Sequence, residues 1–264
     1  MNGQLKAHET RGYAERLLEA YRTHTPMPPL TSERPDLTAA DAYHIQSELV
    51  SLLLADGNDR IVGYKLGLTS RPMQELLGVN EPDYGPVLRS MVVSDNADVP
   101  ADQFIQPKIE AELALVLEHD LRGPGVTIDD ARVAIGGAYV ALEIIDSRIE
   151  DWKIKLPDTI ADLASGAAVV LGPQPVPVDF DPRLVGVVVT KNGSLVTTGA
   201  GAAALGDPIG AVAWLANTLG AYDVALEAGR FVMTGSLHAA FTLSPGDIVE
   251  AEADRLGTVT VRLI

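Results

Sequence analysis

Two glutamates separated by a single residue interrupt an otherwise apolar run, Lys108-Ile-Glu-Ala-Glu-Leu-Ala-Leu-Val-Leu117. This run is too apolar for a solvated loop, and its composition favours a β-strand. The period of two in a strand places Glu110 and Glu112 on one face and the intervening apolar residues on the other. The chain must therefore fold with two acids side by side at the head of a buried strand, where like charges repel unless a positive group lies between them.

A third acid, Glu143, lies in a second apolar run, Ala138-Tyr-Val-Ala-Leu-Glu-Ile-Ile145. An unpaired buried carboxylate is costly and otherwise becomes neutral by taking up a proton. Three carboxylates that converge on one point form a site for a hard cation such as magnesium or manganese. An alternative stays open, because each acid could instead pair with a lysine or arginine, or point outward from an edge strand.

Composition limits the class of protein. The 264 residues, of which 47% are hydrophobic, can bury a large core without covalent cross-links. The absence of cysteine excludes disulfides, zinc–thiolate sites and thiol nucleophiles, and it is consistent with a cytoplasmic location. We expect a soluble, unexported protein, because the sequence has no signal-peptide-like or membrane-spanning apolar stretch. The net charge of −16 argues against nucleic acid or anionic membranes as partners.

The order of predicted elements indicates a small helical N-terminal portion, residues 1–80, before a mainly β core, residues 81–264. Prolines predict an extended loop over residues 25–35, between two helices. Asn192-Gly193 predicts a hairpin turn, and Asp207-Pro208 predicts a helix start. The predicted helices are 11–22, 38–54 and 207–219, and the predicted strands are 61–66, 108–117, 138–145, 184–190, 195–198, 230–233, 248–253 and 258–263.

Several other segments carry chemically active residues. Lys65 lies between two glycines at a strand end, where it could meet a carboxylate or remain on the surface. The segment Pro82-Asp-Tyr-Gly85 is read as an ordinary turn. Residues 146–155 are dense in charge, which suggests either a partly ordered segment over a site or a solvated one. His238 could line a pocket, but a lone histidine is more often structural.

One glycine-rich segment, Gly199-Ala-Gly-Ala-Ala-Ala-Leu-Gly206, invites comparison with phosphate-binding loops. It lacks the lysine of a P-loop and does not join the first strand and helix of a βαβ unit. We therefore interpret it as a place of close backbone packing, or as a loop near the site.

Four segments together resemble the hydratase/decarboxylase branch of the fumarylacetoacetate hydrolase superfamily: residues 63–70, 82–85, 107–112 and 141–148. Residues 146–162 are similar to the 2-hydroxypenta-2,4-dienoate hydratases of that branch. The resemblance implies an α+β fold with a mixed β-sheet roll or distorted barrel and a small α/β N-terminal portion. It also implies Mg²⁺ or Mn²⁺ as cofactor and assembly into homo-oligomers, with association with other enzymes of the pathway as a further expectation.

The resemblance also assigns residues. It implies metal ligation by three acids, a site lysine, an acid/base aspartate, a site serine and a backbone amide facing the ligand: Glu110, Glu112 and Glu143, then Lys65, Asp83, Ser165 and Leu88. The motif before Ser165 departs from the family pattern, because leucine stands at position 163 where asparagine is usual. Two basic residues, Arg148 and Lys155, are further candidates for substrate contact.

The implied activity is that of a metal-dependent hydro-lyase of meta-cleavage aromatic catabolism. It would add water to a 2-hydroxy-2,4-dienoate to give a 4-hydroxy-2-oxo acid. The alternative is decarboxylation of a 2-oxo-3-enedioate of the 4-oxalocrotonate type, which needs a cation for the second carboxylate, with Arg148, Lys153 and Lys155 as candidates. A non-catalytic subunit is a third hypothesis, which metal affinity would test.

Overall fold

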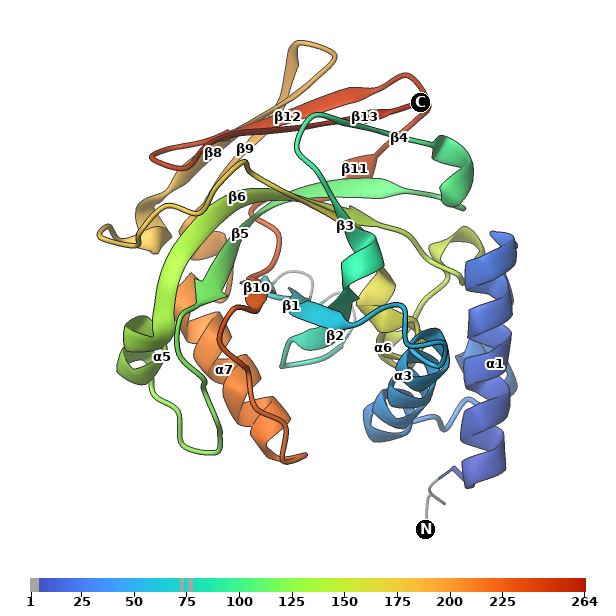
Figure 1. Ribbon diagram of the computed structural model, residues 1–264. Coiled ribbons are helices and arrows are strands. Elements are labelled where there is room, and N and C mark those ends of the chain that lie inside the picture. Colours follow the sequence, from blue (N-terminus) through green and yellow to red (C-terminus); the bar gives the residue numbers. More distant parts are fainter. Residues whose placement is uncertain (1–4, 72–73, 76–77) are drawn as a thin grey trace.

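The computed structural model describes residues 5–71, 74–75 and 78–264. Two β-sheets form the centre of the fold (Figure 1). The larger sheet has the order β2-β1-β10-β5-β6-β7-β3, and β11 also pairs with β5. Its strands are β1 (Ile61–Gly67), β2 (Asp83–Leu88), β3 (Val92–Val93), β5 (Lys108–Leu117), β6 (Ile135–Ile145), β7 (Gly166–Leu171), β10 (Phe231–Met233) and β11 (Phe241–Thr242).

The smaller sheet has the order β4-β13-β12-β8-β9 and lies over the long strands β5 and β6, at the top of Figure 1. Its strands are β4 (Ala97–Val99), β8 (Gly186–Lys191), β9 (Ser194–Ala200), β12 (Ile248–Ala253) and β13 (Gly257–Leu263). The Asn-Gly turn joins β8 to β9 as predicted.

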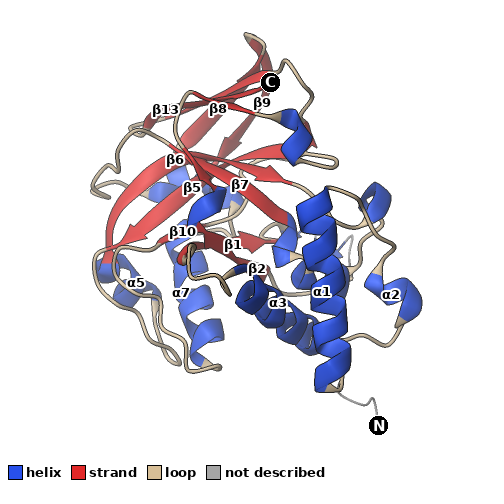
Figure 2. Cartoon of the chain, turned by 45° about the vertical axis from the view of Figure 1, so that its right-hand side comes forward, coloured by secondary structure: helices blue, strands red, loops and turns tan. Residues whose placement is uncertain are grey.

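Helices cover two sides of the larger sheet (Figure 2). The α-helices are α1 (Ala7–Thr23), α2 (Leu30–Glu33), α3 (Ala39–Leu53), α5 (Ile128–Ala134), α6 (Leu156–Ala161) and α7 (Pro208–Gly220). Short 3₁₀ segments are η1 (Arg89–Met91), η2 (Ala101–Gln103), η3 (Glu150–Trp152), η4 (Leu163–Ser165), η5 (Pro182–Leu184) and η6 (Gly201–Ala203).

Two apolar layers follow from the alternation of side chains along the strands. On β5, Ile109, Ala111 and Leu113 pack into a cluster that also contains residues of the smaller sheet and of α7. Ala114 points the other way, into a second cluster with α1 and α3. The predicted two-residue period of this strand is therefore confirmed, and Glu110 and Glu112 lie on its second face.

Local capping also follows the sequence. The Thr38 hydroxyl accepts the Asp41 amide hydrogen at 3.1 Å, and the Asp41 carboxylate accepts the Thr38 amide hydrogen at 3.2 Å, so α3 begins with the predicted capping box. At α7, Asp207 accepts the Ile209 amide hydrogen at 2.9 Å and Pro208 occupies the first turn.

The structure confirms the predicted fold class and corrects several predicted elements. Residues 25–35 contain the short helix α2, because Pro29 stands at its N-cap, where no amide hydrogen is needed. The predicted turn at Asp83 is instead the start of β2. The elements α5, α6 and β7 were not predicted. The division at residue 80 stays a prediction, and β1 and β2, on either side of it, pair within one sheet.

Within the described part of the chain, none of the helices combines the length and apolar character required to cross a membrane.

Candidate metal centre and active site

The register of β5 and β6 brings the three glutamates together. These strands are antiparallel, with Glu110 directly opposite Glu143 and Glu112 opposite Ala141. One carboxylate oxygen from each glutamate lies within 4.8 Å of the others. Glu112 and Glu143 are each only 1% exposed, whereas Glu110 is half-buried. The convergence predicted from the sequence is therefore present on the face that carries the second apolar cluster.

Protein groups balance the charges of this cluster only in part, because one lysine, Lys65, faces three glutamates. Among the residues that the structure describes, Glu112 Oε1 and both carboxylate oxygens of Glu143 have no hydrogen-bond partner, although they are buried. Glu112 Oε2 accepts the Gly235 amide hydrogen at 2.9 Å. Burial, and then repulsion by Glu143, raises the pKa of Glu110 to about 7, and the same two causes raise the pKa of Glu112. Such an all-oxygen, electron-rich set fits a Mg²⁺ or Mn²⁺ ion.

Lys65 provides the nearest positive charge. Strand β10 lies between β1 and β5, with Lys65 level with Met233 and Met233 level with Ala114. The ammonium nitrogen lies 3.3 Å from Glu143 Oε1 and donates to the Ala164 carbonyl oxygen at 2.8 Å. Burial lowers the pKa of Lys65, but the surrounding carboxylates, Glu143 first, raise it further, so the net direction is upward. Lys65 is therefore an ammonium ion at neutral pH.

Asp83 lies on the strand beside Lys65, opposite Gly67. It is buried, and its Oδ1 atom has no hydrogen-bond partner in the described structure. Burial raises its pKa, and Lys65 offsets part of that rise. A β-carbon on Gly67 would lie 2.2 Å from Asp83 Oδ1, so this carboxylate requires a glycine at that position. Asp83 is thus a buried carboxyl group whose pKa is raised by burial, which suits proton transfer.

The loop between β10 and β11 supports the glutamates in a way that sequence reasoning missed. His238 Nε2 accepts the Ala111 amide hydrogen at 2.9 Å, and Nδ1 lies 2.9 Å from the Ala239 carbonyl oxygen. Because Nε2 accepts a hydrogen bond it carries no proton, so the imidazole ring is neutral and its proton is on Nδ1. Ala111 is the residue between Glu110 and Glu112, so this histidine fixes the peptide that carries two of the acids. The sequence contained no spacing signal for this role, because the contact joins segments 127 residues apart.

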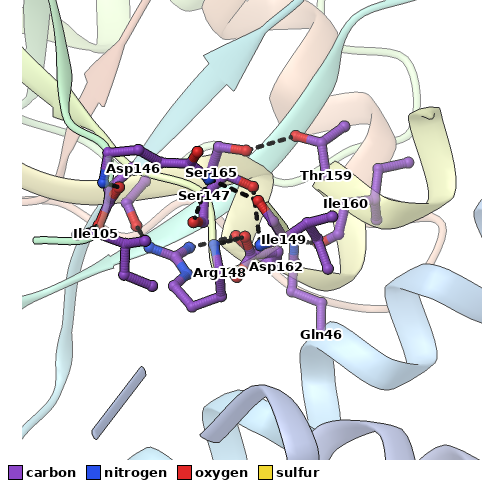
Figure 3. Close-up of polar contacts among 12 residues, drawn as sticks. Gln46, Ile105, Asp146, Ser147, Arg148, Ile149, Thr159, Ile160, Asp162 and Ser165 are labelled. Atoms are coloured by element: carbon purple, nitrogen blue, oxygen red, sulfur yellow. Dashed lines mark hydrogen bonds and ion pairs between the residues drawn. The ribbon is translucent and has the colours of Figure 1, made fainter. Parts of the chain in front are cut away.

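Ser165 is buried beside the cluster. Its Oγ lies 3.1 Å from Thr159 Oγ1, as Figure 3 shows. A β-carbon on the next residue, Gly166, would lie 3.6 Å from Glu143 Oε1. The structure thus brings the backbone around Ser165 to the glutamates.

Three predicted substrate contacts have other partners or are exposed to solvent. The Arg148 guanidinium is 3% exposed and is bonded to Asp162 (Figure 3). It also donates to the Gly166 carbonyl oxygen. Lys155 is exposed at the N-cap of α6. The Leu88 amide points to Met91 Sδ at 3.5 Å, because η1 follows β2 directly. The geometry therefore gives no support for substrate contact by these three residues.

A cavity of about 750 Å³ opens next to this site. Its wall includes Thr69 and four residues of the glycine-rich segment, among them Leu205, whose amide donates to the Thr69 carbonyl oxygen at 3.0 Å. Thr69 packs against Gly235, the residue whose amide binds Glu112. The interpretation of the glycine-rich segment as a loop near the site agrees with this arrangement.

Comparisons with known proteins agree with one another. The family model for the fumarylacetoacetate (FAA) hydrolase C-terminal domain matches residues 69–264. A 2-hydroxyhexa-2,4-dienoate hydratase from Comamonas testosteroni is 41% identical over 257 residues, covering 96% of each chain. A 2-hydroxypent-2,4-dienoate hydratase from Pseudomonas putida is 45% identical over 80% of this chain and 96% of its own. The solved 4-oxalocrotonate decarboxylase from Pseudomonas putida G7, complexed with magnesium and adipate, has a TM-score of 0.95 at 36% identity, covering 98% of this chain and 99% of that chain.

Proposed function

Since the chain belongs to the fumarylacetoacetate hydrolase family, we propose that it is a metal-dependent hydro-lyase that adds water to a 2-hydroxy-2,4-dienoate, giving a 4-hydroxy-2-oxo acid. The observation that carries this proposal is the convergence of three glutamates, which Lys65 balances only in part, with Asp83 on the neighbouring strand. The two dienoate hydratases that resemble the chain at 41% and 45% identity support the substrate class. The proposal includes a place in meta-cleavage aromatic catabolism, a cytoplasmic location and assembly of identical chains.

Glu110, Glu112 and Glu143 would hold Mg²⁺ or Mn²⁺. When bound, the ion supplies Lewis-acid polarisation of the oxygen at C2 and a template for the neighbouring carboxylate. The oxygens of Glu112 and Glu143 that lack hydrogen bonds support this assignment, because buried carboxylates are stable as anions only beside a cation and Lys65 alone cannot balance three glutamates. With the ion present, a dianionic substrate can enter a protein whose net charge is −16.

Lys65 stabilises the negative charge that develops on the C2 oxygen when the dienol becomes a ketone. Its ammonium group is preorganised by the Ala164 carbonyl, and a buried, fixed charge of this kind is more effective than one in water. Asp83 takes the proton from the hydroxyl group at C2 and delivers a proton to C5, which produces the conjugated ketone. Water then adds at C4, which becomes the carbon bearing the new hydroxyl group, while C3 takes up the second proton.

Decarboxylation of a 2-oxo-3-enedioate is the alternative from the same family, and the solved decarboxylase supports it through the fold. It requires a cation at the distal carboxylate of the substrate. Of the three candidates, Arg148 is bonded to Asp162, Lys153 is paired with Asp151 on the surface, and Lys155 is exposed. None of these three candidates therefore supports decarboxylation.

The decisive assay mixes purified protein with 2-hydroxypenta-2,4-dienoate and follows the loss of dienol ultraviolet absorbance with Mg²⁺ and with EDTA. The expected product is heavier by one water, and its formation stops in EDTA. The Glu250→Gln variant, altered on the exposed face of β12, is the matched control and retains full activity. No reaction with the dienoate, together with CO₂ release from a 2-oxo-3-enedioate, would replace this proposal with the decarboxylase.

A further inference from the structure

Three consecutive residues beside the site adopt a left-handed backbone. Leu163 has φ 55°, Ala164 has φ 51° and Ser165 has φ 57°. Side chains with a β-carbon disfavour this conformation, and only glycine, asparagine or aspartate adopts it readily. A run of three such residues persists only where the surrounding structure holds it. We call Asp162–Gly166 the left-handed turn.

Arg148 holds both ends of this turn (Figure 3). Its Nη2 donates to the Asp162 carbonyl oxygen at 2.6 Å and its Nη1 to the Gly166 carbonyl oxygen at 3.1 Å, while Nε forms an ion pair with the Asp162 carboxylate. The Arg148 amide also donates to Asp162 Oδ2 at 2.9 Å. The planar guanidinium thus spans the two carbonyls that bracket the left-handed residues, which a lysine ammonium cannot do.

Two carbonyl groups of the left-handed turn contact strands β1 and β2. Ala164 O accepts from Lys65 Nζ at 2.8 Å. Leu163 O packs against β2, where a β-carbon on Gly85 would lie only 2.4 Å from it. The direction of these carbonyls depends on the left-handed conformation, because rotation of the backbone into the ordinary region would reorient the peptide groups. The position of the Lys65 ammonium therefore depends on the contacts of Arg148 with Asp162 and Gly166.

We propose that Arg148 and Asp162 are positioning residues, which hold the left-handed turn so that the Ala164 carbonyl aims Lys65 at the C2 oxygen of the substrate. The inference rests on the proposed function for the identity of that oxygen. It assigns Arg148 a role away from the substrate, in agreement with its burial and with its stacking 5.8 Å above the Tyr21 ring.

The test distinguishes an effect on the position of the Lys65 ammonium from an effect on metal binding. Arg148→Lys keeps the positive charge but loses the planar guanidinium that binds both carbonyl oxygens. The matched control is Arg183→Lys, which changes an exposed arginine paired with Asp181. Calorimetry measures Mg²⁺ affinity, and then the affinity of the Mg²⁺-loaded protein for oxalate, a dianion that mimics a 2-oxo acid enolate. For Arg148→Lys we expect oxalate affinity about tenfold weaker and kcat about 100-fold lower, with Mg²⁺ affinity within about twofold of wild type. Arg183→Lys should match wild type throughout.

A second substitution asks whether the effect acts through the turn. Ala164→Gly makes the left-handed conformation inexpensive while keeping the carbonyl that Lys65 uses. In the Arg148→Lys background it should restore oxalate affinity by about fivefold, a rescue that a general loss of stability would not show. Absence of rescue, or equal losses of Mg²⁺ and oxalate affinity, overturns the proposal, as does wild-type behaviour of Arg148→Lys.

If Arg148→Lys does not fold, Asp162→Asn gives the answer instead. It removes the negative charge that pairs with Arg148 Nε and keeps the Asp162 backbone carbonyl that Nη2 binds. Oxalate binding weaker by about threefold or more, with Mg²⁺ affinity within about twofold of wild type, supports the positioning role, and unchanged oxalate binding overturns it. Failure of the wild-type protein to hydrate the dienoate would refute the proposed function alone, because the oxalate comparison does not depend on turnover.

Discussion

Replacing Glu110 by glutamine should stabilise the metal-free protein while it weakens the metal site. In the absence of metal, burial and then repulsion by Glu143 raise the pKa of Glu110 from 4.5 to about 7. That rise corresponds to about 3 kcal/mol of folding free energy lost at pH 8, because each pH unit between the two values costs about 1.4 kcal/mol. A neutral amide removes this cost, and its hydrogens can donate to the unpartnered oxygens of Glu143.

The sign of the effect depends on pH. Below pH 4.5 the Glu110 carboxyl is protonated in both folded and unfolded chains, so the variant and wild type should differ little. As pH rises, the unfolded chain ionises first, and the stability of wild type falls relative to the variant until pH passes about 7. The advantage of Glu110→Gln should therefore be absent at pH 4 and full at pH 8.

Urea unfolding at pH 4 and pH 8 measures this difference, with EDTA and then with Mg²⁺. In EDTA at pH 8 we expect the variant to gain up to about 3 kcal/mol, which is an upper bound because the cluster can relax. With Mg²⁺ the order should reverse, because wild type gains binding energy that the variant lacks. Glu250→Gln, on the exposed face of β12, should change stability by less than about 0.5 kcal/mol. A variant no more stable than wild type in EDTA at pH 8 would refute the view that burial and repulsion by Glu143 disfavour the charged form of Glu110.

Three further substitutions probe other parts of the site. Glu112→Gln should abolish Mg²⁺-dependent turnover, with metal affinity at least about 100-fold weaker by calorimetry, and full activity would remove this residue from the ligand set. His238→Leu should weaken Mg²⁺ binding about tenfold, because the Ala111 amide loses its hydrogen-bond acceptor. His238→Gln keeps an acceptor and should retain most of the affinity. Equal Mg²⁺ affinities in the two variants would argue against the support of the glutamates by His238. Gly67→Ala should lower kcat about 100-fold with Mg²⁺ affinity unchanged, because the new methyl displaces Asp83, and a normal kcat would contradict proton transfer by that carboxyl.

The three candidate metal ligands could be singled out from sequence because their signal is local. A strand's period of two places Glu110 and Glu112 on one face without reference to any other part of the chain. Glu143 was identified by the same reasoning, as a charge in an apolar strand. That Glu110 and Glu143 are cross-strand neighbours needed the register of β5 and β6, which sequence alone does not specify.

Other parts of the site depend on contacts between distant segments. The sequence around Asp83 predicts a turn, because a Pro-Asp-Tyr-Gly segment has strong turn propensity, whereas the pairing of this segment with β1 lies outside any local window. Lys65 reaches the glutamates only because β10, from residues 231–233, inserts between β1 and β5. Arg148 was interpreted as a substrate contact because a basic residue in a polar segment gives no sign of its partner.

The sequence by itself determined which residues could form a hard-cation site, because charge and strand periodicity are properties of neighbouring residues. Only the tertiary structure decided how that site is completed. The left-handed turn shows the reason most clearly: Leu163, Ala164 and Ser165 have no intrinsic preference for positive φ, and their conformation is held by Arg148 and Asp162. Such a conformation costs energy locally and is stable only through packing, so no local pattern predicts it.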